Sequence, residues 1–344
     1  IPIQNIYYML SYAFQVLNEQ GYKNIATEQF HNTAELMAAI LEKGIAIQLK
    51  RGLGKEYIPQ TEALSSLRGK IDIAESIKTQ SMLRKQLICT YDEFSVNSIM
   101  NQIIKSTVEL LLRSNISKQR KKNLRKLMVY FSEVDFIDSY TVNWNVQYNR
   151  NNQTYRMLIS ICYLVVKGLL QTQSNGHTKL MDFLDEQRMC RLYEKFILEY
   201  YRKEFKNQIT ANASQIPWQL DNEENSMLSV MQSDIMLQSG EKVLIIDAKY
   251  YEHSTQVQFD KHTLHSGNLY QIFTYVKNKE YELREKDHTV SGMLLYAKTD
   301  EEIYPNNVYQ MSGNQIDVRT LDLNLPFDEI ASQLNTIAKT HFDL

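Results

Sequence analysis

The sequence predicts an α/β protein, with an α+β N-terminal part and a C-terminal part built as a central mixed sheet flanked by helices. The first observation is a pair of apolar stretches in residues 226–251 that is typical of two strands joined by a tight turn. Gly240 lies in that turn, and glycine readily takes the positive φ that a hairpin needs. The second observation is the alternation of amphipathic helical stretches with further apolar strands after this pair. Such alternation favours a sheet with helices packed on its faces.

The N-terminal part is predicted to begin with helices. Helical periodicity is present in residues 6–17 and 33–43, and again in residues 95–112. Between them, residues 45–57 predict a strand, a glycine-flanked tip and a second strand, and residues 68–73 add another short strand.

Two basic features stand out in this part. Lys50, Arg51 and Lys55 flank the glycines of the predicted hairpin tip. Composition favours a solvated tip, and a basic finger that touches a partner or a phosphate is the alternative. Between residues 118 and 126, six of nine residues are basic: Lys118, Arg120, Lys121, Lys122, Arg125 and Lys126. Most such runs are solvated helix faces, and the alternative is binding of DNA or of an acidic partner.

A polar stretch, residues 148–154, separates this part from an apolar helix. It predicts a boundary between two domains, residues 1–150 and residues 151–344. In the second domain a helix is predicted to end near residue 205, with Asp182 or Asp185 as its N-terminal cap. Two strands and a closing helix are predicted after the hairpin, at residues 293–296, 316–321 and 327–340.

The composition is that of a water-soluble globular protein. Of 344 residues, 43% are hydrophobic and 23% are charged, and the formal net charge is −2. The most apolar run, residues 157–170, contains Lys167 and is too short to span a bilayer, and no signal peptide is visible, so no membrane association is expected. Three cysteines fit no metal-binding spacing and are expected to be reduced thiols of a cytoplasmic protein: Cys89, Cys162 and Cys190.

The near-neutral net charge also bears on DNA binding. Proteins that hold DNA through phosphate contacts alone are more often basic. Either the basic surface is local, or a partner holds the DNA.

Charged side chains gather at the end of the predicted hairpin, whose second strand ends on Asp247, Ala248 and Lys249. Alternation along a strand places Asp247 and Lys249 on the same side, roughly 6–7 Å apart. Counting back through the turn places Asp234 opposite Asp247. Two such carboxylates repel each other unless a cation lies between them, and an oxygen-rich pocket with access to water suits Mg²⁺. The alternative is a surface strand that ends in an Asp–Lys pair.

A helix follows over residues 266–276, with Ser266 as its predicted N-cap. Gln271 and Tyr275 are four residues apart and so lie on one face of that helix. The order of an acid, a hairpin, D-x-K and a helix with Q-x-x-x-Y resembles the PD-(D/E)xK nuclease superfamily, in particular its RecB-like branch. The proline of the superfamily name is absent, because Ser233 precedes the acid.

Two glutamates on the earlier helix are candidates for a further metal ligand. Glu194 and Glu199 flank the apolar stripe of that helix on opposite sides. Either can lean toward the metal site, and helical geometry alone does not choose between them.

The whole chain resembles the McrC family, whose members are subunits of McrBC modified-cytosine restriction systems. The matching stretches follow one order along nearly all of the chain: IP-x-x-NIYYML-x-YA at the start, RGL at 51–53, RGKI at 68–71, N-x-IIKST at 101–107, LY-x-KF at 192–196, DAKYY at 247–251 and HS-x-NLYQ at 265–271. The resemblance implies a nuclease subunit that is inactive alone and works with a GTP-hydrolysing AAA+ ring. This McrB-like ring would recognise modified cytosine in double-stranded DNA and translocate the DNA.

For residues 1–150 the resemblance implies binding to the ring and stimulation of its GTPase. It also implies that N-terminal elements, such as the basic tip around Arg51, enter the central pore of the ring. The chain contains no P-loop of the form GxxxxGK[ST], so GTP is expected to act only through the partner.

The residues and the resemblance together predict metal-dependent hydrolysis of a DNA phosphodiester. Asp234 and Asp247 are expected to hold Mg²⁺, or Mn²⁺ in its place, with the backbone carbonyl of Ala248 as a further ligand. Lys249 is expected to orient or activate a water and to offset charge on the transition state. Gln271 is expected to support the site or the scissile phosphate from the neighbouring helix, and Glu194 is the candidate for a fourth member of the metal site.

Two other classes of protein fit parts of the pattern. One is an autonomous RecB-like exonuclease or junction resolvase, which would cut DNA without any GTPase. The other is a non-catalytic adaptor that kept the fold only to bind a ring. The intact set of Asp234, Asp247 and Lys249 argues against the adaptor, because a decayed site would usually have lost at least one of these charges.

Overall fold

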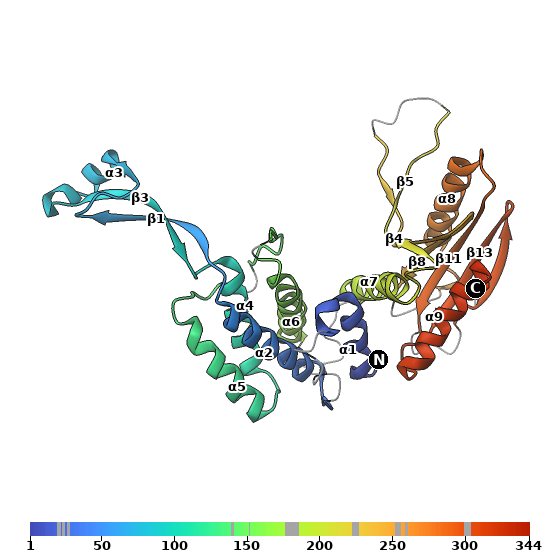
Figure 1. Cartoon of the computed structure of the whole chain (residues 1–344), viewed down its shortest axis with the longest axis horizontal. Coiled ribbons are helices and arrows are strands. Elements are labelled where there is room, and N and C mark those ends of the chain that lie inside the picture. Colours follow the sequence, from blue (N-terminus) through green and yellow to red (C-terminus); the bar gives the residue numbers. More distant parts are fainter. Residues whose placement is uncertain are drawn as a thin grey trace. The chain divides into compact units, whose positions relative to one another are not determined.

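The computed structural model describes residues 1–18, 22, 25, 28–138, 141–150, 152–175, 186–221, 227–251, 256–258, 261–298 and 304–344. The chain forms two compact units. Unit 1 comprises Ile1–Gln29 and Leu184–Leu344, and unit 2 comprises Phe30–Phe183. In Figure 1, unit 2 therefore carries the blue-to-green elements that follow α1, and unit 1 carries α1 with the yellow-to-red elements. Within the described ranges, no helix combines the length and the apolar character that a membrane span requires.

The N-terminal residues belong to unit 1, in contrast to the boundary expected at residue 150. The Asn5 side chain donates hydrogen bonds to the backbone carbonyls of Leu323 and Leu325, each at 2.8 Å. The Tyr12 hydroxyl donates to Glu204 Oε1 at 2.9 Å. These contacts join positions about 190 to 320 residues apart in the chain, so local composition gives no sign of them.

The polar stretch at residues 148–154 lies inside unit 2 and does not separate the compact units. Just after it, the Tyr155 hydroxyl accepts a hydrogen bond from the backbone N–H of Gly54 at 2.7 Å and donates one to Asn101 Oδ1 at 2.8 Å. These bonds fix the start of the following helix to the rest of unit 2. The ring-binding role expected for residues 1–150 stays a prediction.

Unit 2 consists of a helical body and a long β-hairpin. Its helices are α2 (Thr33–Arg51), α3 (Ile73–Lys78), α4 (Ile99–Arg113), α5 (Lys118–Met128) and α6 (Tyr155–Asn175), with 3₁₀ turns at Ser81–Arg84 and Val129–Phe131. Strands β1 (Glu56–Leu64), β2 (Lys70–Asp72) and β3 (Leu87–Ser95) form an antiparallel sheet in the order β1-β3-β2. Figure 1 shows β1 and β3 leading away from the helices to a tip that carries α3. We call this hairpin with its tip, residues 56–95, the finger.

The strand expected at residues 45–49 is wrong, because α2 continues through them to Arg51. Its buried positions keep a helical spacing: Leu41, Ile45 and Gln48. β-branched residues favour a strand locally, but packing of this face against the neighbouring helices outweighs that preference. Lys50 and Arg51 therefore occupy the last turn of α2, where cations favour the helix terminus. Gly52, with φ of 92°, ends the helix, and Lys55 precedes β1.

Unit 1 is built on a six-stranded mixed sheet in the order β12-β13-β11-β8-β7-β4. Strand β11 runs parallel to β8 and β13, and the remaining pairs are antiparallel. The helices are α1 (Ile3–Ala13), α7 (Glu186–Glu204), α8 (Ser266–Leu283) and α9 (Phe327–Phe342), and a 3₁₀ turn covers Gln15–Asn18. The strands of the sheet are β4 (Thr210–Asn212), β7 (Ile235–Ser239), β8 (Lys242–Lys249), β11 (Thr289–Ala297), β12 (Asn307–Met311) and β13 (Asn314–Leu321). Two small ladders accompany it: β5 (Gln215–Ile216) with β6 (Met231–Gln232), and β9 (Gln256–Gln258) with β10 (Lys261–Thr263).

The expected elements of this part are confirmed, with differences at their ends. The helix predicted to end near residue 205 is α7, and the expected caps Asp182 and Asp185 lie outside the described residues. Helix α8 begins one residue earlier than expected, so Ser266 is its first residue and His265 occupies the N-cap position. Strand β12, an exposed edge strand, was not among the expected elements.

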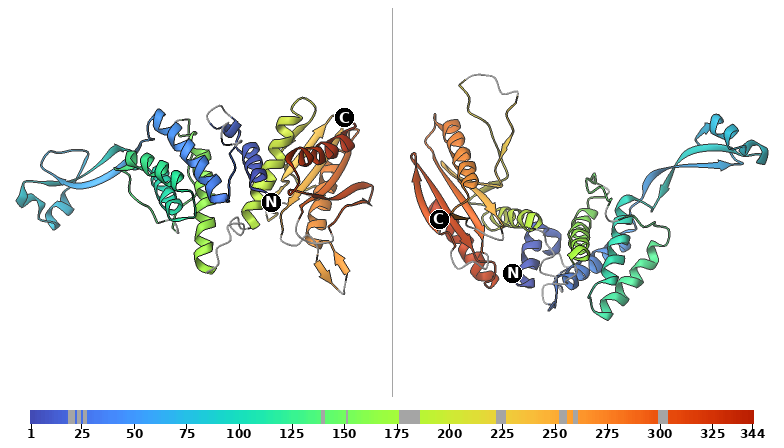
Figure 2. Two further views of the ribbon diagram at one scale, coloured as in Figure 1. Left: turned by 90° about the horizontal axis from the view of Figure 1, so that it is seen from below. Right: turned by 180° about the vertical axis from the view of Figure 1, so that it is seen from behind.

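Alternation along β8 decides what each face of the sheet contacts. Val243 and Ile245 share a core cluster with Ile272 of α8, so odd-numbered side chains of β8 face α8. Helices α7 and α9 pack on the other face, where the Tyr201 hydroxyl donates to the carbonyl of Leu334 at 2.9 Å. Figure 2 shows α8 and α9 on opposite sides of the sheet. The side chains of Asp247 and Lys249 therefore lie on the α8 face.

A buried ion cluster ties α9 to the sheet beside a pocket of about 260 Å³. Asp317 is 1% exposed, and its Oδ1 accepts a hydrogen bond from Gln315 Nε2 at 2.7 Å. Its Oδ2 lies 3.3 Å from both Arg319 Nη2 and His341 Nε2. Burial alone would raise the pKa of Asp317, but these hydrogen bonds and charges bring it below its ordinary value.

We expect Asp317→Ala to lower the free energy of unfolding by about 3 kcal/mol at pH 7, because it leaves Arg319 and His341 without their carboxylate. Since the folded-state pKa of Asp317 is lowered, its contribution is present above the unfolded-state pKa of about 3.9 and is lost as the pH falls through the folded-state value. Urea unfolding of the full chain at pH 7 and at about pH 3.5 measures both effects. Asp343→Ala, which removes an exposed partner of Lys242, is the control. Equal losses from both variants at pH 7 would contradict this role for the cluster.

Candidate active site

The hairpin of β7 and β8 has the predicted register. Gln238 pairs with Val243, and the ladder continues to Ile235 opposite Ile246. Pairing also extends to Ser239 opposite Lys242, so the loop is two residues long, and Gly240 takes a φ of 56°. Asp234 immediately precedes β7 and so comes next to Asp247 in this register. Its Oδ2 accepts a hydrogen bond from the backbone N–H of Ala248 at 3.0 Å.

Asp247 is a buried carboxylate with unused oxygens. It is 1% exposed, and among the described residues neither of its oxygens accepts a well-aligned hydrogen bond. Lys249 Nζ lies 2.9 Å from Oδ2 and forms an ion pair with it. Burial, with a further contribution from Asp234, raises the pKa of Asp247 to about 7, against the lowering effect of Lys249. This group therefore gains from any additional cation placed near it.

Lys249 is held from two sides. Besides its ion pair with Asp247, its Nζ donates to Gln271 Oε1 of α8 at 3.3 Å. Gln271 Nε2 in turn donates to the Tyr275 hydroxyl at 3.0 Å. Burial would lower the pKa of Lys249, but the Asp247 carboxylate raises it above its ordinary value, so the amine stays charged. Gln271 and Tyr275 thus hold the Lys249 side chain in place through hydrogen bonds.

The structure distinguishes the two glutamates of α7. Glu194 lines an open pocket of about 350 Å³ together with Asp234 and the cationic residues Arg191 and Lys195. Burial and then the charge of Asp234 raise the pKa of Glu194. Glu199 instead forms an ion pair with Arg202 Nη1 at 2.7 Å. Glu194 is therefore the glutamate that accompanies the Asp234 carboxylate.

One neighbour of the site was missed. The Cys190 thiol donates to Glu194 Oε1 at 3.1 Å, and its sulfur lies 3.9 Å from the carbonyl oxygen of Ala248. Burial and Glu194 raise the pKa of Cys190 to about 12, so the thiol is protonated and can donate. The spacing of four residues between Cys190 and Glu194 on one helix was the available signal. Metal-binding spacing does not detect such a pair.

A second group of side chains fixes the start of α8. Asn268 is buried, and its Nδ2 donates to the Tyr296 hydroxyl of β11 at 3.0 Å. The Tyr251 hydroxyl donates to Asn268 Oδ1 at 3.4 Å. This network connects the residues just after D-x-K with the helix that carries Gln271, and so sets how that helix faces the site.

The donor set fits a divalent cation with oxygen ligands. Within the described ranges, no three His, Cys, Asp or Glu side chains come together at metal-binding distances. Mg²⁺ usually binds one or two carboxylates and keeps several waters. Asp234 and the unsatisfied oxygens of Asp247 supply such carboxylates, and the pocket beside Asp234 gives access to water.

Comparisons with known proteins agree over most of the chain. The family model of the McrBC 5-methylcytosine restriction system component matches residues 4–297. The chain is 29% identical over 342 residues to the Type IV methyl-directed restriction enzyme EcoKMcrBC of Escherichia coli (strain K12), which covers 97% of this chain and 96% of that protein. Its fold is similar to a chain in the refined half-complex from a tetradecameric assembly of Thermococcus gammatolerans McrB AAA+ hexamers with bound McrC. That match has a TM-score of 0.50 and 17% identity, and it covers 98% of this chain and 76% of that chain.

We expect Glu194→Gln to raise the thermal midpoint of the metal-free protein by about 2 °C at pH 8, because it removes a charge that burial and Asp234 disfavour. The folded-state pKa of Glu194 is raised, so the stability cost of its ionisation grows as the pH rises through the unfolded-state value of about 4.3 toward the folded-state value. The gain should therefore vanish near pH 4.

The control is Glu199→Gln, which breaks an ion pair and should give no gain at either pH. Melting curves in EDTA at both pH values make the comparison. A lower midpoint for Glu194→Gln at pH 8 would show that Glu194 is held by its cationic neighbours rather than strained against Asp234.

Proposed function

The chain belongs to the family of McrBC 5-methylcytosine restriction system components, and from that premise we propose that it is the nuclease subunit of a GTP-dependent, modified-cytosine-specific restriction endonuclease. Its activity would be Mg²⁺-dependent hydrolysis of DNA phosphodiesters, with Mn²⁺ as a substitute ion. Its partner would be an McrB-like AAA+ GTPase ring that supplies the GTP chemistry. The observation that carries this proposal is the buried Asp247 beside Asp234, with its ion-paired Lys249 oriented by Gln271.

In this mechanism Asp234 and Asp247 hold the ion, with the carbonyl of Ala248 as a further ligand and Glu194 close to Asp234. The bound Mg²⁺ supplies polarisation of a phosphate oxygen and a lower pKa for a water. Lys249, charged and fixed, offsets negative charge that grows on the phosphate in the transition state. Because Tyr275 holds Gln271 and Gln271 holds the ammonium, little reorganisation of Lys249 is needed when DNA arrives.

We expect Lys249→Gln to reduce DNA cleavage by the chain with its ring at least about a hundredfold, since it removes the cation next to the reacting phosphate. Lys242→Gln, at the opposite end of the same strand, is the matched control and should cleave at the wild-type rate. Cleavage of a plasmid with modified cytosine, timed on agarose gels, is the measurement. Wild-type rates for Lys249→Gln would remove this residue from the mechanism.

Removal of the carboxylates should separate ion binding from folding. We expect Asp234→Asn and Asp247→Asn to weaken Mn²⁺ binding at least about tenfold, because an amide oxygen is a poor substitute for a carboxylate on a hard cation. Electron paramagnetic resonance of free Mn²⁺ in titrations of the full chain measures this without any cleavage. Asp322→Asn is the control. Equal affinities in all three variants would place the ion elsewhere.

The finger of unit 2 carries exposed apolar side chains that are suited to binding the ring. Large apolar side chains of the segment between β1 and β3 are exposed by 53–82%: Leu67, Ile73, Ile77, Met82 and Leu83. Such an apolar patch is typical of a protein-binding surface. We propose that this apolar tip, in place of the basic tip expected around Arg51, enters the ring and stimulates its GTPase.

Leu83→Glu should then reduce the stimulated GTPase rate at least about fivefold, because it places a charge in an apolar contact. Val308→Glu, an exposed apolar position on β12, is the control. Phosphate release by the ring, titrated with each variant, is the measurement. An unchanged titration for Leu83→Glu would locate the ring contact outside the apolar tip. DNA cleavage by the wild-type chain without any ring would instead favour an autonomous nuclease.

A further inference from the structure

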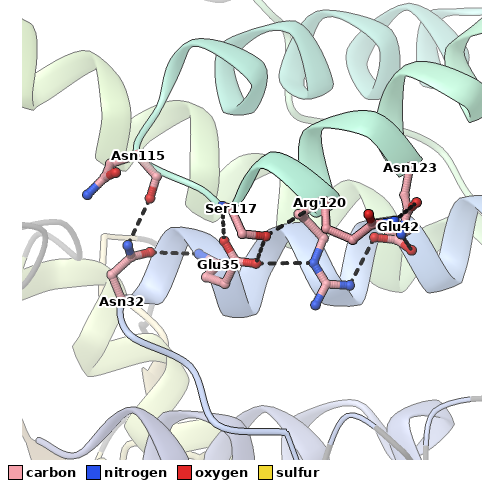
Figure 3. Close-up of polar contacts among 8 residues, drawn as sticks. Asn32, Glu35, Glu42, Asn115, Ser117, Arg120 and Asn123 are labelled. Atoms are coloured by element: carbon pink, nitrogen blue, oxygen red, sulfur yellow. Dashed lines mark hydrogen bonds and ion pairs between the residues drawn. The ribbon is translucent and has the colours of Figure 1, made fainter.

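The six basic residues of α5 divide between two faces of the helix. Ser117 and Arg120 face α2 (Figure 3): the Ser117 hydroxyl donates to Glu35 Oε1 at 2.8 Å, and Arg120 Nη1 donates to Glu42 at 2.9 Å. Leu124, one turn further, is fully buried. Arg120 is therefore a structural residue that neutralises glutamates of α2.

The other basic residues of α5 are uncompensated. They are Lys118, Lys121, Lys122, Arg125 and Lys126; Lys121 is half-buried, and the other four are exposed. In the part of the chain that the structure describes, none of the five takes part in an ion pair or a side-chain hydrogen bond. Positions 118, 122 and 125 follow one face of the helix, and 126 adjoins them. We call the four exposed residues the basic stripe.

Helix stability does not explain this charge. Cations in the first turn oppose the helix dipole, and α5 has no acidic residue in its first turn to offset Lys118 and Lys121. No Asp or Glu lies anywhere in α5, so the lysines lack partners at i+3 or i+4 within the helix. Only Arg125 and Lys126, in the last turn, favour the dipole. The stripe thus costs stability within this chain.

We propose that the basic stripe of α5 binds the phosphate backbone of duplex DNA, as a contact in unit 2 that is separate from the candidate active site. The eight helical steps from Lys118 to Lys126 give the stripe a length of about 12 Å, which matches about three or four phosphates along one DNA strand. Lysine is depleted at protein–protein interfaces, whereas Lys and Arg supply most phosphate contacts. Because the net charge of the chain is −2, any DNA-binding surface of its own has to be a local basic region, and the stripe is such a region.

The stripe is distinct from the apolar tip of the finger. The tip carries large exposed hydrophobic side chains, whereas the exposed positions 118, 122, 125 and 126 are all cationic. In the views of Figures 1 and 2, α5 belongs to the helical body from which the finger leads away. Unit 2 thus presents one surface suited to a protein and another suited to a polyanion.

The test compares two triple variants of the full chain that lose the same charge. Lys122→Gln, Arg125→Gln and Lys126→Gln together alter the stripe, and Lys70→Gln, Arg84→Gln and Lys85→Gln alter exposed cations of the finger. Glutamine keeps the helix propensity of α5, and circular dichroism melts check that both fold. Fluorescence anisotropy with a labelled 30-base-pair duplex measures Kd between 50 and 200 mM salt. The assay contains EDTA, so it is independent of the nuclease chemistry; the inference rests on the proposed function only in naming DNA.

We expect the plot of log association constant against log salt to be shallower for the stripe variant. The magnitude of its negative slope should fall by about 2.7, since each of the three lost phosphate contacts contributes about 0.9. The rise in Kd between 50 and 200 mM salt should then be about 40-fold smaller than for the wild type. The finger variant should keep the wild-type slope. Equal changes in both variants would reduce the effect to net charge and overturn the proposal. An unchanged slope for the stripe variant, with lost binding to the ring, would assign the stripe to an acidic protein surface instead.

Discussion

The candidate site depends on one interaction, the ion pair between Asp247 and Lys249 at the buried end of β8. Both side chains project toward α8 because strand alternation places them there, and both are largely removed from water. Burial raises the pKa of the Asp247 carboxylate to about 7 even with Lys249 beside it, and the ion pair with Lys249 leaves its oxygens without a well-aligned hydrogen bond among the described residues. A second cation beside these oxygens would offset their charge, and for this reason we propose that the site binds a metal ion.

Other elements of unit 1 position the residues around this ion pair. The parallel pairing of β8 with β11 buries the strand, α8 brings Gln271 and Tyr275 to the lysine, and the tight β-hairpin brings Asp234 beside Asp247. Helix α7 adds Glu194 from the other face of the sheet. The site therefore draws on both faces of the sheet at one end of its central strands. At that end the backbone N–H of Ala248 donates a hydrogen bond to Asp234.

Much of this site could be predicted from sequence, because it depends on local rules. Register counting placed Asp234 beside Asp247, and the i, i+4 rule placed Gln271 with Tyr275. Helical geometry alone could not choose Glu194 over Glu199, because the choice depends on which of them lies beside Asp234 in the folded chain. The helical state of residues 45–49 and the membership of residues 1–29 in unit 1 were also out of reach, since tertiary contacts decide them.

The proposed chemistry requires Asp234 and Asp247 to bind one metal ion together. The most direct measurement is anomalous diffraction from crystals of the chain soaked in Mn²⁺. We expect a single peak within coordination distance of one oxygen of each aspartate, next to the carbonyl oxygen of Ala248. An absence of any peak between the two carboxylates at saturating Mn²⁺, with the Asp247–Lys249 ion pair intact, would contradict it.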